Sequence, residues 1–298
     1  GCNCCVHPLT AAGGKLILMH KWNAEEALEL IERERPSTFT GVPTMVRELL
    51  NSPDFAQRDT SSLQNLGGGG APVQPDLVHK IEERAEGRPA TGYGLTEVNG
   101  VVTINAGHFF LAKPESAGSP CPIMESRIVD EDGHDRPVGE TGELWVRGGN
   151  VFRGYLNHPE ATAEVLTEGW FHTGDIGYFD DDGFLFLVDR AKDMVLRGGE
   201  NVYSAEVEAA VYEHPAVAEA AVFAVPDDRL GEAVGVAVVL LDGDFCTADE
   251  LRDHTRQLIA SFKVPEYVWF LDQPLPQNAN GKFLKRELRE RLVGTPAD

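Results

Sequence analysis

Residues 92–97 read Gly-Tyr-Gly-Leu-Thr-Glu, and these residue types at this spacing could serve a phosphate-bearing ligand. Gly92 and Gly94 flank an aromatic ring, Tyr93, that could stack on a base. A hydroxyl and a carboxylate follow: Thr96 could donate to a phosphate oxygen, and Glu97 could bind Mg²⁺, which prefers oxygen ligands. A strand end with a polar turn explains the same residues without a ligand, so both interpretations stay open.

A glycine run precedes this segment at residues 67–72, which read Gly-Gly-Gly-Gly-Ala-Pro. Glycine lets the backbone adopt conformations closed to other residues and come close to a flat ligand. The alternative is a flexible surface turn, and the run alone does not separate the two.

Charged candidates recur farther along the chain. Asp175 ends the segment His-Thr-Gly-Asp at 172–175, where its carboxylate could accept from two ribose hydroxyls or simply form a β-turn. Residues 189–193 read Asp-Arg-Ala-Lys-Asp; Arg190 could also reach a ribose, and a solvated charge cluster is the alternative. His172 has no cysteine or histidine nearby in sequence, so we do not interpret it as a metal ligand.

Two glycine-containing loops lie toward the C-terminus. Gly198 and Gly199 form a second place where the backbone could approach a ligand. Residues 280–282 read Asn-Gly-Lys, and on spacing alone Lys282 is typical of a solvated turn lysine.

The apolar pattern predicts the elements that must position these residues in the first part of the chain. Asn23 and Glu26 form a capping-box pattern that opens a helix, and Pro75 opens another. A strand at 38–40 and a helix through 45–50 lie between them. Alternating helices and strands predict an α/β organisation for residues 1–105.

The pattern changes twice after that. Short strands among Gly, Pro and Asp turns predict a β-rich subdomain over 106–188. A small α+β domain is predicted over 189–298, with the boundary near 189–192. The strands expected in these two parts are 126–129, 142–147, 183–188, 220–225, 233–241 and 267–271. The helices expected in the last part follow Ser204, the capping box of Thr247 with Glu250, and Lys285.

Composition excludes several partners. The formal charge is −22, from 26 Lys and Arg against 48 Asp and Glu, and a surface this acidic repels nucleic acid and anionic membrane. No apolar run reaches the roughly 18 residues of a membrane span, and no signal peptide is recognisable, so we expect a cytoplasmic protein. The cysteines, Cys2, Cys4, Cys5, Cys121 and Cys246, lack zinc spacing and are expected to be buried and reduced.

In this order, the segments resemble the adenylate-forming superfamily, which includes acyl-CoA ligases, non-ribosomal adenylation domains and beetle luciferases. The resemblance extends from about residue 15 to residue 292. The matching segments are Gly-Tyr-Gly-Leu-Thr-Glu at 92–97, Gly-Glu-Leu at 142–144, His-Thr-Gly-Asp at 172–175, Asp-Arg-Ala-Lys-Asp at 189–193, Gly-Gly-Glu-Asn-Val-Tyr at 198–203 and Asn-Gly-Lys at 280–282. The resemblance implies a partial AMP-binding domain over 1–188 and a mobile C-terminal domain over 189–298.

The resemblance also implies a role for each matching residue. Gly69, Gly70 and Ala71 would line the adenine and acyl pocket, and Gly92, Tyr93 and Gly94 would hold the adenine, with Tyr93 stacked on it. Thr96 would hold the α-phosphate and Glu97 the Mg²⁺. Asp175 and Arg190 would bind the ribose, Lys192 would sit at the hinge, and Gly198 and Gly199 would border the pantetheine tunnel. Lys282 resembles the family's mobile catalytic lysine.

The implied activity is an AMP-forming acyl-CoA ligase. It would use ATP and Mg²⁺ to turn a carboxylic acid into an acyl-adenylate and would pass the acyl group to coenzyme A. Segments such as Gly-Val-Pro-Thr-Met at 41–45 look most like medium- or long-chain fatty acyl members, with aryl acids as the alternative. Homodimer formation stays open.

One family element is missing from the sequence. The phosphate loop, rich in Ser, Thr and Gly, lies in the family upstream of the region that matches residue 1. We therefore expect an N-terminally truncated chain with impaired ATP binding, because that loop holds the β- and γ-phosphates. A non-catalytic fragment that binds AMP or acyl-adenylate is the competing hypothesis.

Overall fold

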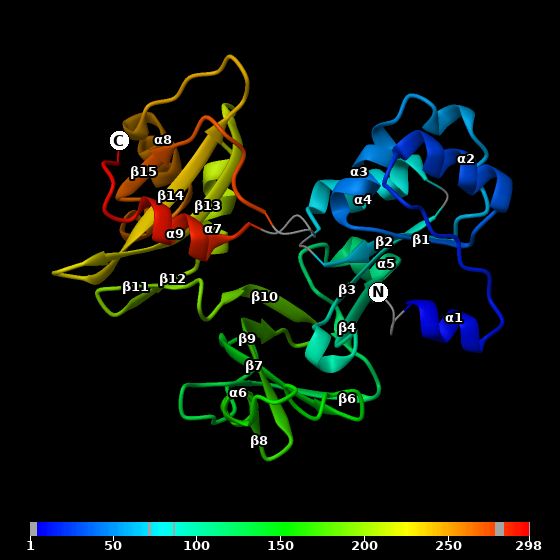
Figure 1. Ribbon diagram of the computed structural model, residues 1–298, viewed down its shortest axis with the longest axis horizontal. Coiled ribbons are helices and arrows are strands. Elements are labelled where there is room, and N and C mark those ends of the chain that lie inside the picture. Colours follow the sequence, from blue (N-terminus) through cyan, green and yellow to red (C-terminus); the bar gives the residue numbers. More distant parts are fainter. Residues whose placement is uncertain (1–4, 71–72, 86, 278–282, 298) are drawn as a thin grey trace. The chain divides into compact units, whose positions relative to one another are not determined.

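The computed structural model describes residues 5–70, 73–85, 87–277 and 283–297 (Figure 1). Contacts divide the chain into two units. The first unit comprises residues 1–173 and 177–187, and the second comprises residues 174–176 and 188–298. None of the helices within these described ranges is long and apolar enough to cross a membrane.

The first unit begins with a five-stranded mixed sheet in the order β1-β2-β3-β4-β5. β1, β2 and β3 pair in parallel, and β4 and β5 continue the sheet antiparallel. The strands are β1 (Thr38–Thr40), β2 (Asn65–Gly69), β3 (Arg88–Tyr93), β4 (Thr103–Ala106) and β5 (Ser119–Pro120). The helices of this part are α1 (His7–Ala11), α2 (Ala24–Glu34), α3 (Pro43–Asn51), η2 (Phe55–Gln57), α4 (Pro75–Arg84), η3 (Thr96–Val98) and α5 (His108–Ala112).

Sequence signals set the helices of this part. The Asn23 side chain accepts from the Glu26 amide at 2.8 Å, which confirms the predicted cap of α2. α2 and α4 each bury an apolar face, with Leu28 and Leu77 at 0% and 1% exposure, in one cluster with Leu66 of β2. The packing of these helices against β2 therefore holds in place the strand that contains Gly67–Gly69.

The second sheet of the first unit has the order β10-β9-β7-β6, and β8 pairs with β9. Its strands are β6 (Met124–Val129), β7 (Gly142–Gly148), β8 (Leu166–Thr167), β9 (Trp170–Phe179) and β10 (Leu185–Arg190), with α6 (Pro159–Val165) between β7 and β8. One face is apolar and includes Ile128, Leu144 and Phe171. The part predicted to be β-rich therefore also contains two short helices, α5 and α6, which its turn-rich pattern did not indicate.

Predicted strand boundaries in this sheet differ from the observed ones: the strand expected from residue 126 begins at Met124, and the other two expected strands end at Gly148 and Arg190. The strand expected from residue 183 begins at Leu185 instead. Asp180 accepts hydrogen bonds from the amides of Asp182 and Phe184, and Gly183 adopts a φ of 77°. The aspartate closes a turn there, so pairing starts only after it.

The second unit is a sheet covered on both faces. The strand order is β12-β11-β14-β13, and β15 pairs with β14 in parallel. Its strands are β11 (Val195–Arg197), β12 (Glu200–Val202), β13 (Val217–Asp227), β14 (Gly231–Leu240) and β15 (Tyr267–Phe270). Its helices are α7 (Ser204–Tyr212), α8 (Ala248–Leu258), η4 (Ser261–Lys263) and α9 (Lys285–Leu292).

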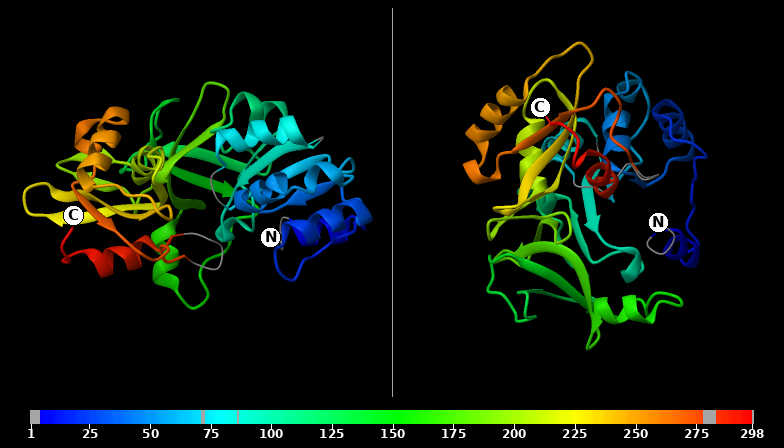
Figure 2. Two further views of the ribbon diagram at one scale, coloured as in Figure 1. Left: turned by 90° about the horizontal axis from the view of Figure 1, so that it is seen from above. Right: turned by 60° about the vertical axis from the view of Figure 1, so that its left-hand side comes forward.

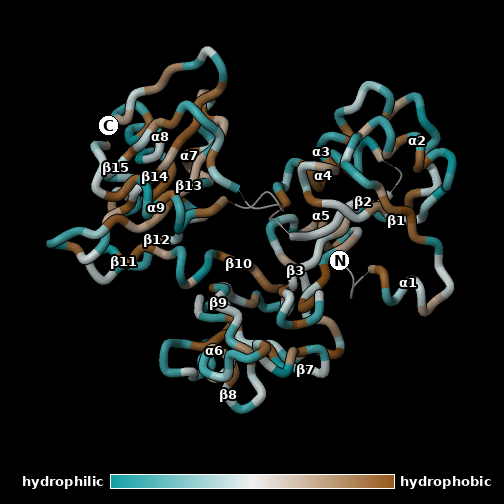
Figure 3. Tube along the Cα trace, viewed as in Figure 1, coloured by the Kyte–Doolittle hydropathy of each residue, from teal (hydrophilic) through white to brown (hydrophobic). Residues whose placement is uncertain are grey.

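Alternation along β13 produces the two covered faces. Val222 packs in a cluster with residues of α7 and α8, whereas Phe223 packs in a second cluster with Leu288 of α9. Figure 2 shows the strands between α8 and α9, and Figure 3 shows the hydrophobic colouring along β13 and β14. β13 and β14 extend into their hairpin beyond the predicted ends because Asp227 closes it by accepting from the amides of Arg229 and Leu230.

Candidate functional site

The glycine run is part of a strand, and most of it is required by packing. A Cβ on Gly67 would lie 1.9 Å from the Ala90 carbonyl oxygen, and one on Gly68 would lie 1.9 Å from the Gly41 carbonyl oxygen. At Gly69 the corresponding distance, to the Gly92 oxygen, is 2.5 Å. The flexible-turn alternative is therefore wrong for Gly67–Gly69, which form the end of β2.

Beyond the strand, the run changes character. Gly70 adopts a φ of 93°, where glycine is favoured, and only a side-chain atom of Val42 lies near its Cβ position. Gly70 is thus the member of the run whose backbone turns away from β2. Ala71 lies outside the described residues.

The segment 92–97 bridges a strand and a short helical turn. Tyr93 ends β3 and is half-buried, and it packs against the apolar cluster under β6 and β7. A Cβ on Gly94 would lie 1.6 Å from the Gly100 oxygen, so this position accepts only glycine in the observed backbone. β3 therefore delivers Thr96 and Glu97 onto the one-turn helix η3.

Glu97 is held by residues that the sequence did not single out. The Tyr155 hydroxyl donates to Oε1 of Glu97 at 3.0 Å, and the Phe152 amide donates to the Glu97 carbonyl oxygen at 2.7 Å. Asn150 donates through Nδ2 to the Val98 oxygen at 2.9 Å. Residues 150–155 thus clamp η3, and no spacing rule connects them to residues 92–97.

The donor set at Glu97 suits Mg²⁺. A carboxylate has two oxygens, and each can accept more than one hydrogen bond. The Tyr155 hydroxyl occupies one acceptor position, on Oε1 of Glu97. Partial burial and then the Glu97 hydrogen bond raise the pKa of Tyr155, which keeps its hydroxyl a donor at neutral pH. Thr96 is exposed beside Glu97 and has its hydroxyl on the same turn.

Asp175 and Arg190, predicted from separate motifs, are in contact within the second unit. Arg190 Nε lies 2.9 Å from Asp175 Oδ1, and Asp175 is only 4% exposed. The backbones are joined as well, because the Ala191 amide donates to the Gly174 oxygen at 2.9 Å. Gly174 adopts a φ of 68° just before Asp175. A carboxylate paired with a guanidinium can also accept hydrogen bonds from hydroxyls of a ligand.

The remaining predicted residues of the second unit lie in turns. Lys192 is exposed in a turn closed by the Asp193 and Met194 amides, which donate to the Arg190 oxygen. Gly198 and Gly199 have φ values of 62° and 89° and form the two-residue hairpin between β11 and β12. That hairpin type requires a positive φ at both positions, which explains the glycine pair on backbone grounds alone.

Lys282 lies outside the described residues. The chain on either side of it is held: Gln277 and Phe283 form a β-bridge, and the Leu284 amide donates to the Pro276 oxygen at 2.8 Å. The structure therefore describes the ends of this loop, and the role of Lys282 stays a prediction.

In the described part of the chain, His172 and the cysteines lie outside the group of side chains that has metal-ligand geometry. The His172 ring stacks on Trp145 at 3.8 Å between centroids, and burial lowers its pKa. Among the described residues, Cys121 and Cys246 are free thiols, and Cys246 is buried; Cys5 and Cys121 are only partly buried, contrary to the expectation of a buried set. Cys2 and Cys4 lie outside the described residues.

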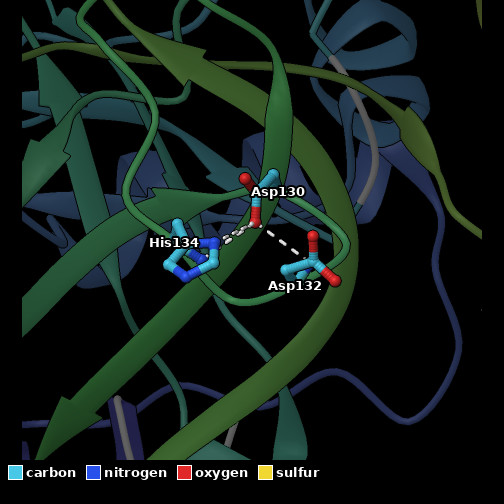
Figure 4. Close-up of side chains that lie close together, drawn as sticks. All are labelled: Asp130, Asp132 and His134. Carbon is cyan, nitrogen blue, oxygen red and sulfur yellow. Dashed lines mark hydrogen bonds and ion pairs between the residues drawn. The ribbon is translucent and has the colours of Figure 1, made fainter.

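In the described part of the chain, one group of three side chains has metal-ligand geometry: Asp130, Asp132 and His134 (Figure 4). These residues form the turn after β6, and Asp130 Oδ1 accepts from the amides of Asp132 and His134 at 3.0 and 2.9 Å. The hydrogen bonds close a turn, which explains the cluster without an ion. Glu97 is not a member of it.

Comparison with known proteins places this geometry in context. The family model described as AMP-binding enzyme matches residues 1–156, and the model described as AMP-binding enzyme C-terminal domain matches residues 206–282. A feruloyl-CoA synthase from Amycolatopsis sp is 42% identical over 96% of this chain and 58% of its own length. A long-chain-fatty-acid–CoA ligase from Yersinia pestis is 41% identical over 97% of this chain and 51% of its own length.

Solved structures agree with these matches. An o-succinylbenzoate CoA synthetase from Bacillus subtilis, in complex with its acyl-adenylate intermediate, is 33% identical and has a TM-score of 0.86 over 94% of this chain and 56% of its own. The same enzyme in complex with ATP and magnesium ion has a TM-score of 0.85 at 33% identity, over 94% of this chain and 57% of its own. The chain spans about half the length of the curated relatives it matches.

Proposed function

The chain belongs to the AMP-binding enzyme family, and from that membership we propose that it forms the nucleotide-binding and C-terminal part of an AMP-forming acyl-CoA ligase. The reaction would activate a carboxylic acid with ATP as an acyl-adenylate and then transfer the acyl group to coenzyme A. The relatives named above are acyl-CoA ligases or synthetases, which supports this reaction class.

The observation that carries the proposal is the contact between Asp175 and Arg190. The two residues come from different motifs, and a ribose-binding role for both requires them to lie together. Their 2.9 Å ion pair satisfies that requirement within one unit of the chain. We propose that Asp175 accepts from the ribose hydroxyls while Arg190 fixes the carboxylate and contacts the ribose.

We propose that the residues of η3 and its approach serve the phosphate end of the nucleotide. Tyr93 would stack on adenine, Thr96 would donate to the α-phosphate, and Glu97, oriented by Tyr155, would hold Mg²⁺. When bound, Mg²⁺ offsets the negative charge that gathers where the carboxylate approaches the α-phosphate. The similar structure of an o-succinylbenzoate CoA synthetase in complex with ATP and magnesium ion supports this assignment.

Lys282 is proposed as the cation of the adenylation step. The acid carboxylate and the α-phosphate are both anionic, so a lysine placed between them stabilises the charge as it redistributes. Loss of one such donor typically costs about 10²–10³ in rate.

Thioester formation is proposed to use the other residues of the C-terminal domain. Gly198 and Gly199 would border the pantetheine tunnel, and Lys192 would act as the hinge between the two half-reactions. The hairpin geometry of the two glycines supports a close backbone approach because neither carries a side chain.

We propose an aliphatic acid as substrate, with aryl acids as the alternative. Relatives of both kinds match at nearly the same identity, 41% for the fatty acyl ligase and 42% for the feruloyl-CoA synthase. A panel containing both classes therefore belongs in the first assay.

The testing experiment is acid-dependent ATP–pyrophosphate exchange by this 298-residue chain with Mg²⁺ and a panel of fatty and aryl acids. Exchange with a preferred acid would support the ligase proposal and identify the acid. AMP binding without exchange would support the alternative, a non-catalytic nucleotide-binding module. Absence of both exchange and AMP binding would refute the nucleotide site in this chain.

A matched pair of variants makes the assay specific. Asp175→Asn should weaken AMP binding about tenfold or more, because the buried acceptor loses its charge. Asp253→Asn removes an exposed carboxylate of α8 that pairs with Arg256, and it should leave AMP binding unchanged. Equal effects of the two variants would contradict the role of Asp175.

A further inference from the structure

A polar network of one buried and three partly buried side chains, outside the predicted site residues, connects three segments of the second unit. Lys285, the first residue of α9, places Nζ 2.7 Å from Glu208 Oε1 and 2.7 Å from Ser204 Oγ. Ser204 Oγ donates to Asp189 Oδ1 at 3.1 Å, and the Ser204 amide donates to the other Asp189 oxygen. The network therefore joins α9, the start of α7 and the end of β10.

The network continues into the proposed ribose site. Asp189 Oδ1 accepts from the backbone amide of Arg190 at 2.8 Å. Arg190 in turn pairs with Asp175. An unbroken series of contacts thus runs from Lys285 through Ser204 and Asp189 to Arg190 and Asp175, all within the second unit.

The charges of this network depend on Lys285. Ser204 is fully buried, and the side chains of Lys285 and Glu208 are 17% and 19% exposed. Burial raises the pKa of both Asp189 and Glu208, and the Lys285 charge acts in the opposite direction on each. Without that cation, two neighbouring carboxyl groups would share a poorly solvated site, and their present arrangement would be disfavoured.

We propose that Lys285 is a positioning residue for the nucleotide site. It acts through Ser204 and Asp189 to hold the backbone at Arg190, and it thereby aims the Arg190 guanidinium at Asp175. In the sequence Lys285 lies three positions after Lys282, so the same contact anchors α9 immediately beyond the Asn-Gly-Lys segment. The inference deepens the proposed function and rests on it for the identity of the ligand.

The chain offers a matched control for simple loss of a buried lysine. The side chain of Lys263, in η4, is 19% exposed, and its Nζ lies 2.6 Å from Glu206 Oε2. Glu206 lies on α7, the helix that also contains Glu208, the partner of Lys285. The ammonium group of Lys263 contacts the Glu206 carboxylate and the Phe262 ring, and neither of these residues belongs to the network that reaches Arg190. Lys263→Met and Lys285→Met therefore remove comparable ion pairs from α7, and only the second interrupts the network.

The first measurement is AMP affinity of the full 298-residue chain and its variants, alongside their unfolding midpoints. Lys285→Met should weaken AMP binding about tenfold, the loss of one charge-assisted contact, whereas Lys263→Met should leave it unchanged. Lys285→Arg, which keeps a cation and its donors, should restore most of the affinity. Ser204→Ala should weaken AMP binding as well. The double variant Ser204→Ala/Lys285→Met should bind AMP with no lower affinity than the single variant of lower affinity, because both changes interrupt the same network.

The second measurement needs no nucleotide: hydrogen exchange at the backbone amide of Arg190. Lys285→Met and Ser204→Ala should both accelerate this exchange, and Lys263→Met should not. If the chain binds no AMP, the proposed function fails, but hydrogen exchange at the Arg190 amide still tests the positioning role of Lys285. Unchanged Arg190 exchange in both Lys285→Met and Ser204→Ala, or equal acceleration in Lys263→Met, would overturn the inference. If Lys285→Met does not fold, Ser204→Ala decides it.

Discussion

The Tyr155 hydroxyl donates to Oε1 of Glu97 across 3.0 Å. The tyrosine lies between β7 and α6, and the carboxylate lies on η3, so the contact joins two segments that are distant in sequence. The Tyr155 ring is held by an edge-on contact with the Phe152 ring, with 4.9 Å between the ring centroids. A carboxylate that is already oriented loses less freedom when it binds a metal ion.

Tyr155→Phe should therefore raise the Mg²⁺ concentration that half-saturates ATP–pyrophosphate exchange by about tenfold, because partners of a metal ligand tune its affinity on that scale. The substitution keeps the ring contact with Phe152 and removes only the hydroxyl. Tyr178→Phe is the control, since Tyr178 stacks on Phe186 in β9 and β10 and has no assigned role. An unchanged Mg²⁺ dependence in Tyr155→Phe would contradict the orienting role.

The contact between Tyr155 and Glu97 could not be predicted from the sequence, whereas local features could. Local signals were sufficient for the helix caps: Asn23 caps α2, and Thr247 with Glu250 forms the predicted capping box of α8. A cap involves residues three positions apart, so the sequence itself contains both partners. Tyr155 and Glu97 meet only through tertiary packing, and no periodicity or spacing relates them.

The contacts of Lys285 could not be predicted from the sequence either, because they also form only through tertiary packing. The sequence predicted α9 from residue 285 and a helix after Ser204, but it could not predict that their first residues meet. That meeting depends on which faces of β13 the two helices cover. Motif resemblance, by contrast, indicated both Asp175 and Arg190, and the structure supplied their contact.

The glycine run provides a stability prediction. Gly67→Ala should lower the free energy of unfolding of the first unit by about 1–3 kcal/mol, the usual cost of forcing atoms into a well-packed interior. The reason is the 1.9 Å distance between the added Cβ and the Ala90 oxygen, which the parallel pairing of β2 and β3 imposes. Urea unfolding followed by fluorescence provides the measurement.

Gly149→Ala is the matched control for Gly67→Ala. Gly149 follows β7, and a Cβ added there would meet no atom within 4 Å. Its stability should stay within about 0.5 kcal/mol of wild type, as for most surface substitutions. Similar losses in both variants would show that the close approach of β2 and β3 is not what requires glycine.

Lys282→Ala should separate the two half-reactions. Adenylation should fall by about 10²–10³ because a cation is lost where two anions approach, whereas thioester formation from supplied acyl-adenylate should be largely spared. The half-reactions are measured by pyrophosphate exchange and by release of coenzyme A thioester. Lys80→Ala removes an exposed lysine that pairs with Asp76 and should leave both unchanged. Equal loss of both half-reactions in Lys282→Ala would refute its role in adenylation.

His172 should make the first unit sensitive to mild acid. Burial is the main cause that lowers its pKa from the usual 6.5; the Arg127 charge acts in the same direction and the Glu143 charge against it. The unfolded chain therefore binds a proton more readily than the folded chain does. The stability contribution is fully present above about pH 6.5 and is lost as pH falls toward the folded pKa.

His172→Phe tests this contribution, because phenylalanine can keep the stacking on Trp145 but binds no proton. The free energy of unfolding, measured in urea between pH 5 and pH 8, should fall less steeply toward acid in the variant than in the wild type. Measurement at pH 8, where the wild-type imidazole is neutral, isolates any change in packing. A variant that loses stability toward acid as steeply as the wild type would show that His172 does not supply this pH dependence, whatever its effect at pH 8.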